Sequence, residues 1–91
     1  MEITFDPAKN AENIRERGLS FERAADFDFT TAVYFLDDRK DYGEKRIRAF
    51  GYFGERLYCL VFVETDDGIR VISFRKANSR EVKRYEQESN P

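Results

Sequence analysis

The sequence predicts a single α+β domain in which helices pack against an antiparallel sheet. Its 91 residues suffice for one hydrophobic core and leave no room for a second. Between residues 31 and 77, runs of alternating apolar and polar residues are separated by short turns, which is typical of hairpins. The flanking residues carry helix-capping signals. We therefore expect a four-stranded antiparallel meander with two N-terminal helices and one C-terminal helix, and leave open whether a short strand over residues 3–5 joins the sheet.

Two helices are predicted near the N-terminus, over residues 7–17 and 21–27. The pair Asp6-Pro7 is a favourable helix start, because aspartate caps the helix and proline fits its first position. Gly18 allows the left-handed conformation that ends a helix, and Ser20 is a cap for the second one. The apolar residues expected to face the core are Ala8, Ala11 and Ile14 in the first helix, and Phe21, Ala24, Ala25 and Phe27 in the second.

Four strands are predicted over residues 31–36, 45–53, 56–65 and 69–77. Tight turns at 54–55 and 66–68 join the last three, whereas the polar segment 37–43 is long enough to be a functional loop. One face of the second strand carries Arg46, Arg48, Phe50 and Tyr52. In the fourth strand the alternation places Ile69 and Val71 on one face, and Ile72 and Phe74 on the other. Because both faces are apolar, we expect this strand to be buried inside the sheet.

The C-terminal helix is predicted to follow Asn78. Glu81 stands three residues further on, which is the spacing of a capping box, in which each side chain accepts a hydrogen bond from the backbone N–H of the other residue. Val82 and Tyr85 lie three residues apart and are expected to face the core.

The charge is unevenly distributed along an acidic chain. The net charge is −2, but residues 39–56 carry a balance of +3 and residues 69–84 a balance of +5. Two basic segments in an acidic chain favour a local anion-binding site over a wholly cationic surface. The alternative is that these cations are ordinary solvated surface charges.

The composition excludes several kinds of active site. Without histidine there is no histidine triad or imidazole acid–base pair, and a single cysteine excludes a structural zinc site, which needs several cysteine or histidine ligands. The glycines do not form a P-loop or a GxGxxG motif. Asp37, Asp38 and Asp41 lack the pattern of a calcium loop, so we expect no metal and no cofactor. Cys59 lies among apolar residues and is expected to be a core residue.

The sequence also gives an expectation about location. No apolar run approaches the roughly 20 residues that a membrane span requires, and residues 1–6 do not have the basic and then apolar pattern of a secretory signal. The lone cysteine suits a reducing compartment. We therefore expect a cytoplasmic protein without membrane contact.

Cations, carboxylates and tyrosines remain, and this set of side chains can cleave RNA. The reaction deprotonates a 2′-hydroxyl, stabilises the charge of a phosphorane and protonates the leaving oxygen. Arginine suits the second task, because its planar fork holds two phosphate oxygens and stays charged, but it cannot be the base. Lys76 can be the base if neighbouring cations favour its neutral form, and Glu44 is the carboxylate alternative.

Several segments occur in an order and at a spacing that are distinctive together. They are Phe5-Asp6-Pro7-Ala8-Lys9 with Asn13, the run from Arg17 to Ala24, the run from Asp37 to Arg46, and the run from Ile69 to Ala77 with Arg80, Glu81 and Tyr85. In these segments, across nearly its full length, the chain resembles the BrnT family of type II toxins, relatives of the RelE-like ribonucleases. Family members usually carry histidine where this chain has Arg17 and Lys40.

The resemblance implies a RelE-like fold, metal-independent RNA cleavage that halts translation, and a neutralising antitoxin of the ribbon-helix-helix BrnA type. DNA would be contacted only through that antitoxin. Combining the residues with the resemblance, we assign catalysis to Arg70, Arg75, Lys76, Arg80 and Glu44, and binding of RNA phosphates to Lys9, Arg46, Arg48 and Tyr85.

We therefore predict an endoribonuclease toxin with RNA as its substrate and an antitoxin as its partner. The alternative is a non-catalytic module whose basic groove receives a segment of a partner protein. A domain with a purely structural role would have neither toxicity nor a partner.

Overall fold

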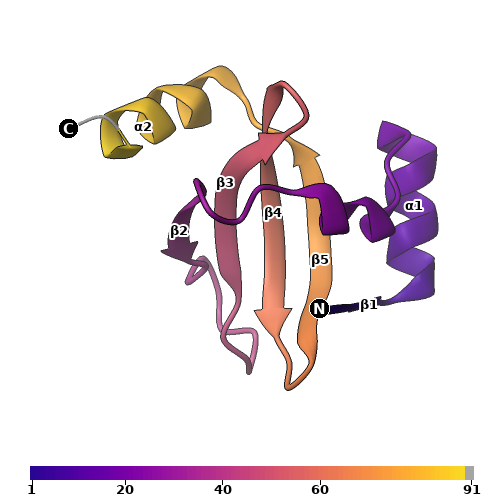
Figure 1. Cartoon of the computed structure of the whole chain (residues 1–91). Coiled ribbons are helices and arrows are strands. Elements are labelled where there is room, and N and C mark those ends of the chain that lie inside the picture. Colours follow the sequence, from indigo (N-terminus) through magenta and orange to yellow (C-terminus); the bar gives the residue numbers. More distant parts are fainter. Residues whose placement is uncertain (90–91) are drawn as a thin grey trace.

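The computed structural model of the chain contains a five-stranded sheet with strand order β1-β5-β4-β3-β2 (Figure 1). The elements in chain order are β1 (Glu2–Phe5), α1 (Pro7–Arg17), a 3₁₀ helix η1 (Phe21–Asp26), β2 (Val33–Leu36), β3 (Ile47–Phe53), β4 (Arg56–Glu64), β5 (Gly68–Lys76) and α2 (Ser79–Ser89). The structure describes residues 1–89, so the last two residues of the predicted domain lie outside it. Within these residues no helix combines the length and the apolar composition that crossing a bilayer requires.

The predicted α+β class is confirmed, and the predicted meander is correct for β2 to β5, which pair antiparallel in chain order. The sheet as a whole is mixed, however, because β1 is present and pairs in parallel with β5, from Glu2 opposite Gly68 to Phe5 opposite Val71. A strand of four residues carries no sequence signal for its direction. The close approach of β1 also explains Gly68, since a Cβ at this position would overlap the carbonyl oxygen of Glu2.

The bounds of α1 agree with the prediction, and so do its caps. The Asp6 carboxylate accepts a hydrogen bond from the Ala8 N–H at 2.9 Å, and Gly18 adopts the left-handed conformation with φ of 66°. The predicted inner face is wrong, however. Ala8, Ala11 and Ile14 are all exposed, and the buried residue of the helix is Asn13, which is only 4 % exposed.

Hydrogen bonding explains this difference. α1 runs alongside β5 beyond the point where β1 ends (Figure 1), so it lies against a strand edge with backbone groups to satisfy. The side-chain amide of Asn13 donates to the carbonyl oxygens of Phe74 and Leu19, both at 2.9 Å, and its oxygen accepts from Arg17 at 2.8 Å. The helix is therefore attached to the sheet by a polar side chain, which an apolar periodicity cannot reveal.

Two apolar layers cover the two faces of the sheet. The inner face packs against the segment around η1, and its cluster contains Leu19, Phe21, Ala24, Phe27, Ala49, Leu60, Phe62, Ile69, Val71 and Phe74. The outer face is partly covered by α2, and its smaller cluster contains Phe50, Leu57, Cys59, Val61, Ala77 and Tyr85. The second predicted helix is a 3₁₀ helix that ends at Asp26, and Ala25 is exposed, whereas its other three predicted core residues are buried.

A β-bulge interrupts the pairing of β4 with β5. Val61 pairs with Ser73, but the next residue of β4, Phe62, pairs with Val71. Ile72 is therefore the extra residue of β5 and has no partner in the register. Such a bulge shifts the alternation of side chains by one position for the rest of the strand.

The bulge decides which residues of β5 share a face. Phe74 lies on the inner face together with Ile69, which corrects the prediction that Phe74 and Ile72 share a face. Arg70 and Arg75 are five residues apart and would point to opposite faces of a regular strand. Because the bulge lies between them, both lie on the outer face.

We predict that Asn13→Ala lowers the free energy of unfolding by about 2–4 kcal/mol, because two carbonyl oxygens lose their buried donor. Ile14→Ala is the matched control in the same helical turn. It should change the free energy of unfolding by less than about 1 kcal/mol, because Ile14 is 45 % exposed. Urea denaturation measures both, and equal effects would contradict the polar attachment of α1.

Candidate functional site

The outer face carries four arginines, three of which lie in two strands of the sheet. Arg48 on β3 and Arg70 and Arg75 on β5 pair with residues of β4 that all lie on this face, namely Val61, Val63 and Cys59. Arg46, just before β3, continues the alternation of Arg48. Residues far apart in the sequence therefore present their guanidinium groups on one side of the sheet.

The first group of charges is centred on Glu44, in the loop before β3. Its carboxylate accepts hydrogen bonds from Arg70 Nη2 at 2.7 Å and from Arg46 Nε at 2.9 Å, and Arg46 also lies over the ring of Tyr42, 4.1 Å from its centroid. The hydrogen bonds from Arg70 and then Arg46 hold the pKa of the Glu44 carboxyl below its usual range. Both arginines line a pocket of about 460 Å³ that Lys9 also borders. We call this pocket, with Glu44, the Arg46–Arg70 pocket.

The second group joins the end of β5 to the start of α2. Arg75 donates two hydrogen bonds to the two carboxylate oxygens of Glu81, at 2.8 and 2.9 Å. The predicted capping box is confirmed, because Glu81 also accepts from the Asn78 N–H and its own N–H donates to the Asn78 side chain, both at 2.9 Å. The Arg75 hydrogen bonds lower the pKa of Glu81, and the same bonds raise that of Arg75.

The third group lines a groove of about 600 Å³ between β3 and α2. Its cations are Arg48, Arg80, Lys83 and Arg84. The Nε of Arg48 is buried and has no hydrogen-bond partner within residues 1–89, so this guanidinium has an unused donor. Arg84 lies over the ring of Phe35, 4.1 Å from its centroid. The structure thus brings two predicted site residues, Arg48 and Arg80, to one groove.

Two predicted site residues do not belong to these three groups of charges. Lys76 pairs with Tyr58 across the sheet and therefore projects to the inner face, away from Arg70 and Arg75. Tyr85 is buried, its hydroxyl donates to the carbonyl oxygen of Thr31 at 2.9 Å, and its ring packs edge-on against Tyr52. Tyr85 is thus part of the apolar cluster of the outer face, and the other seven of the nine predicted residues carry charged groups at this face or its rim.

Sequence reasoning did not identify the charged pair formed by Asp37 and Arg39. The Asp37 carboxylate is buried and accepts two hydrogen bonds from Arg39, at 2.7 and 2.8 Å, which lower its pKa. The Asp37 N–H donates to the carbonyl oxygen of Arg46, so this residue also closes the base of the 37–46 loop. The sequence feature that could have revealed this pair is an aspartate directly after an apolar strand.

Cys59 is a core residue as predicted, and burial raises the pKa of its thiol to about 11.

The arrangement can bind anions and hold a carboxylate in its ionised form. Among the described residues, no group of three or more acids and cysteines has the geometry to hold a metal ion. The acids of the outer face, Asp37, Glu44 and Glu81, are instead each held by arginine. Guanidinium groups fixed beside a carboxylate suit the binding of a phosphodiester and the movement of a proton next to it.

One comparison with known proteins gave a match. The family described as the ribonuclease toxin BrnT of type II toxin–antitoxin systems matches residues 5–81 of the chain. No curated protein and no solved structure matches it. The matched range contains every predicted site residue except Tyr85.

We predict that Glu81→Gln lowers the free energy of unfolding by about 1 kcal/mol at pH 7, because the ion pair with Arg75 is lost while glutamine keeps the capping box. The folded-state pKa of Glu81 lies below its unfolded value, so the pair stabilises the fold above the unfolded pKa and this contribution is lost as the pH falls through the folded pKa. The difference between variant and wild type should therefore be smaller at about pH 3, below the unfolded pKa of glutamate, than at pH 7. Urea denaturation at both pH values measures this, with the exposed Glu86→Gln as control; a difference that persists undiminished in acid would contradict it.

Proposed function

The chain belongs to the BrnT family of ribonuclease toxins of type II toxin–antitoxin systems, and we propose that its RNA-cleaving site lies on the outer face of the sheet, at the Arg46–Arg70 pocket. A ribonuclease toxin must bind a phosphodiester and move two protons. The observation that carries this proposal is the position of Glu44, a carboxylate between two arginines beside a pocket that a lysine also borders.

Each chemical task has a side chain in this pocket. Glu44 takes the proton of the 2′-hydroxyl, whose oxygen attacks the adjacent phosphorus. Arg46 and Arg70 retain N–H groups that Glu44 does not use, and these stabilise the added charge of the phosphorane. The ammonium group of Lys9 gives a proton to the leaving 5′ oxygen, so that a 2′,3′-cyclic phosphate and a 5′-hydroxyl are formed.

Glu44 is assigned as the base in preference to Lys76, because Lys76 projects to the other face of the sheet. Its lowered pKa means that Glu44 is fully ionised at neutral pH and is a weak base that acts through its position. The same hydrogen bonds hold both arginines in place before RNA binds. The phosphate then binds to guanidinium groups that are already oriented.

The remaining cations of the outer face are proposed to hold the RNA on either side of the cut. Arg48 and Arg80 line the groove beside α2, and Arg75 lies at the end of β5. Each contact with a phosphate releases counterions, so the affinity for RNA should fall steeply with salt. Cleavage of RNA in this way inhibits translation, and the proposed place of action is therefore the cytoplasm.

A type II toxin has a protein antitoxin as its partner. We infer that this antitoxin is of the ribbon-helix-helix BrnA type, and that the toxin reaches DNA only through it. The acidic net charge of −2 and the concentration of twelve of the sixteen cations in residues 39–56 and 69–84 support this, because a domain that binds DNA directly usually carries a larger basic surface.

We predict that Arg70→Ala and Glu44→Gln each lower the rate of RNA cleavage about 100-fold or more, because each removes one group that acts on the phosphorane or the 2′-hydroxyl. Arg15→Ala, which removes an exposed cation from α1, is the matched control and should cleave at the wild-type rate. Cleavage of a labelled RNA and growth arrest in bacteria measure the effect, and circular dichroism checks the fold. Unchanged rates in both variants would reject this site, and a folded wild-type chain that binds its antitoxin but leaves RNA intact would favour the non-catalytic alternative.

The pH dependence tests the base separately. The wild-type rate should be nearly constant between about pH 5.5 and 8.5, because the chain has no histidine and Glu44 stays ionised in this range. The rate should fall only in acid, below the usual range of glutamate, because the hydrogen bonds from Arg70 and Arg46 hold the pKa of Glu44 below that range. Single-turnover cleavage across this range measures the profile. A tenfold rise in rate per pH unit would show that hydroxide, and not Glu44, removes the proton.

A further inference from the structure

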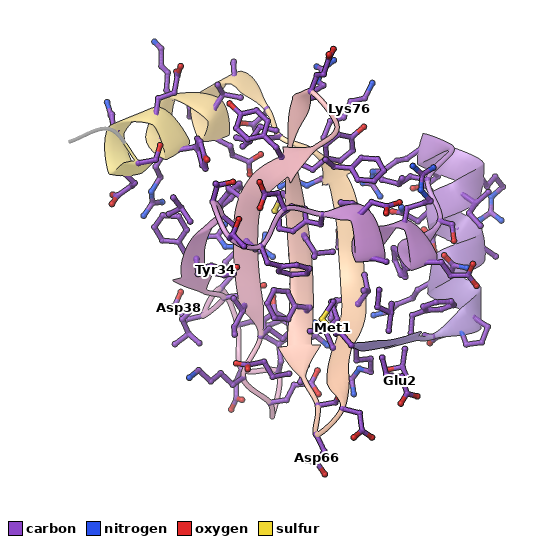
Figure 2. All side chains as sticks on the ribbon, in the orientation of Figure 1. Met1, Glu2, Tyr34, Asp38, Asp66 and Lys76 are labelled. Atoms are coloured by element: carbon purple, nitrogen blue, oxygen red, sulfur yellow. The ribbon has the colours of Figure 1, made fainter. Side chains whose placement is uncertain are left out.

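A pocket of about 480 Å³ lies at the end of β5 on the inner face, and of the predicted site residues only Arg75 and Lys76 border it. Its main side chains are Arg17, Arg23, Phe53, Tyr58 and Lys76. They come from the end of α1, from η1, from both strands of the β3–β4 hairpin and from β5. Figure 2 shows Lys76 at this end of the sheet, opposite the end that carries Asp66. We call it the β5-end pocket.

The charge of this pocket is largely uncompensated. Lys76 and Arg17 form no ion pair within residues 1–89, and Arg17 donates to the uncharged amide of Asn13. Only Arg23 is paired, with the exposed Asp26 at 3.3 Å. By contrast, internal carboxylates hold Arg46, Arg70 and Arg75 on the outer face. Three cations around one pocket with a single exposed carboxylate attract an anion.

The wall of the pocket is aromatic. The rings of Phe53 and Tyr58 meet edge to face, with centroids 5.0 Å apart, and the guanidinium group of Arg23 lies 5.0 Å from the centre of the Phe53 ring. The hydroxyl of Tyr58 has no hydrogen-bond partner among the described residues. Rings combined with arginine and lysine are the features by which proteins bind single-stranded nucleic acid, because bases stack on the rings while cations hold phosphates. The volume is within the range of small-molecule sites.

We propose that the β5-end pocket binds one nucleotide of the RNA substrate, with its base against Tyr58 and Phe53 and its phosphate held by Lys76 and Arg17. This deepens the proposed function and rests on it. Arg75 and Lys76 are consecutive and project to opposite faces of the sheet, so an RNA strand that passes the end of β5 contacts the outer face and then this pocket. The pocket thus binds RNA beyond the segment that is cut.

The first test uses 5′-AMP and the full chain, with binding followed by NMR titration. We expect 5′-AMP to bind more tightly than adenosine or inorganic phosphate, because only 5′-AMP uses both the aromatic wall and the cations. Lys76→Ala should weaken binding about fivefold or more, whereas Arg15→Ala should leave it unchanged. Absence of binding, an affinity that Lys76→Ala does not change, or phosphate binding as tight as that of 5′-AMP would overturn the proposal.

The second test uses a 2′-O-methyl RNA oligonucleotide, which lacks the attacking hydroxyl and cannot be cut. If Lys76 contacts a phosphate, the slope of log affinity against log salt should become less steep by ~0.7 in Lys76→Ala, and should not change in Arg15→Ala. An unchanged slope in Lys76→Ala means that the pocket does not hold the strand. The competing occupant of this pocket is an acidic segment of a protein partner. If an acidic peptide displaces 5′-AMP more strongly than the RNA does, the nucleotide assignment is also overturned.

The two proposals fail separately. If Arg70→Ala keeps 5′-AMP binding but loses cleavage, the cleavage site and the nucleotide pocket are both supported as distinct sites. If cleavage depends on Arg70 and Glu44 while 5′-AMP does not bind, only the β5-end pocket is rejected. If 5′-AMP binds as expected while cleavage is unaffected in Arg70→Ala, only the cleavage site is rejected.

Discussion

The single extra residue in β5 is the constraint on which the site depends. The bulge at Ile72 places Arg70 and Arg75 on the same face, although their spacing in a regular strand would separate them. The inner core maintains this arrangement, because the ring of Phe74 packs against those of Phe27, Phe53 and Tyr58. Removing the bulge would turn Phe74 out of the core and Arg75 into it. The same packing that stabilises the fold therefore orients the arginines.

Carboxylates allow so many arginines to lie close together on one face of a small sheet. Like charges on one face repel each other. Because the free energy of unfolding of a domain of this size is small, this repulsion is a substantial cost. Glu44, Glu81 and Asp37 each offset part of that repulsion through short hydrogen bonds to arginine. They also fix the directions of the guanidinium groups, which a set of free surface side chains would not have. The β5-end pocket lacks such acids, so its cations remain available to a ligand.

Signals that act within a few residues were readable in the sequence. The caps of α1, the capping box formed by Asn78 and Glu81, and the hairpin turns depend on local chemistry and were predicted correctly. Features that depend on residues distant in the sequence were not predicted. The parallel pairing of β1, the burial of Asn13 and the bulge in β5 arise only when the sheet edge and the core are assembled. Alternation along β5 predicts that Arg75 and Lys76 project to opposite faces of the sheet. The bulge determines that Arg75 is the one on the outer face, with Arg46, Arg48 and Arg70.

The pairing of β1 with β5 has a consequence for the synthesis of the protein. The first strand has its only neighbour in the sheet near the other end of the chain, with Phe5 opposite Val71. Until residues 68–71 have been synthesised, β1 has no partner in the sheet. The sheet therefore cannot close before β5 has been made, because the contacts between β1 and β5 join residues that are distant in sequence. Arg70, which belongs to the proposed cleavage site, lies on β5 and therefore takes its place in the completed sheet only at this step.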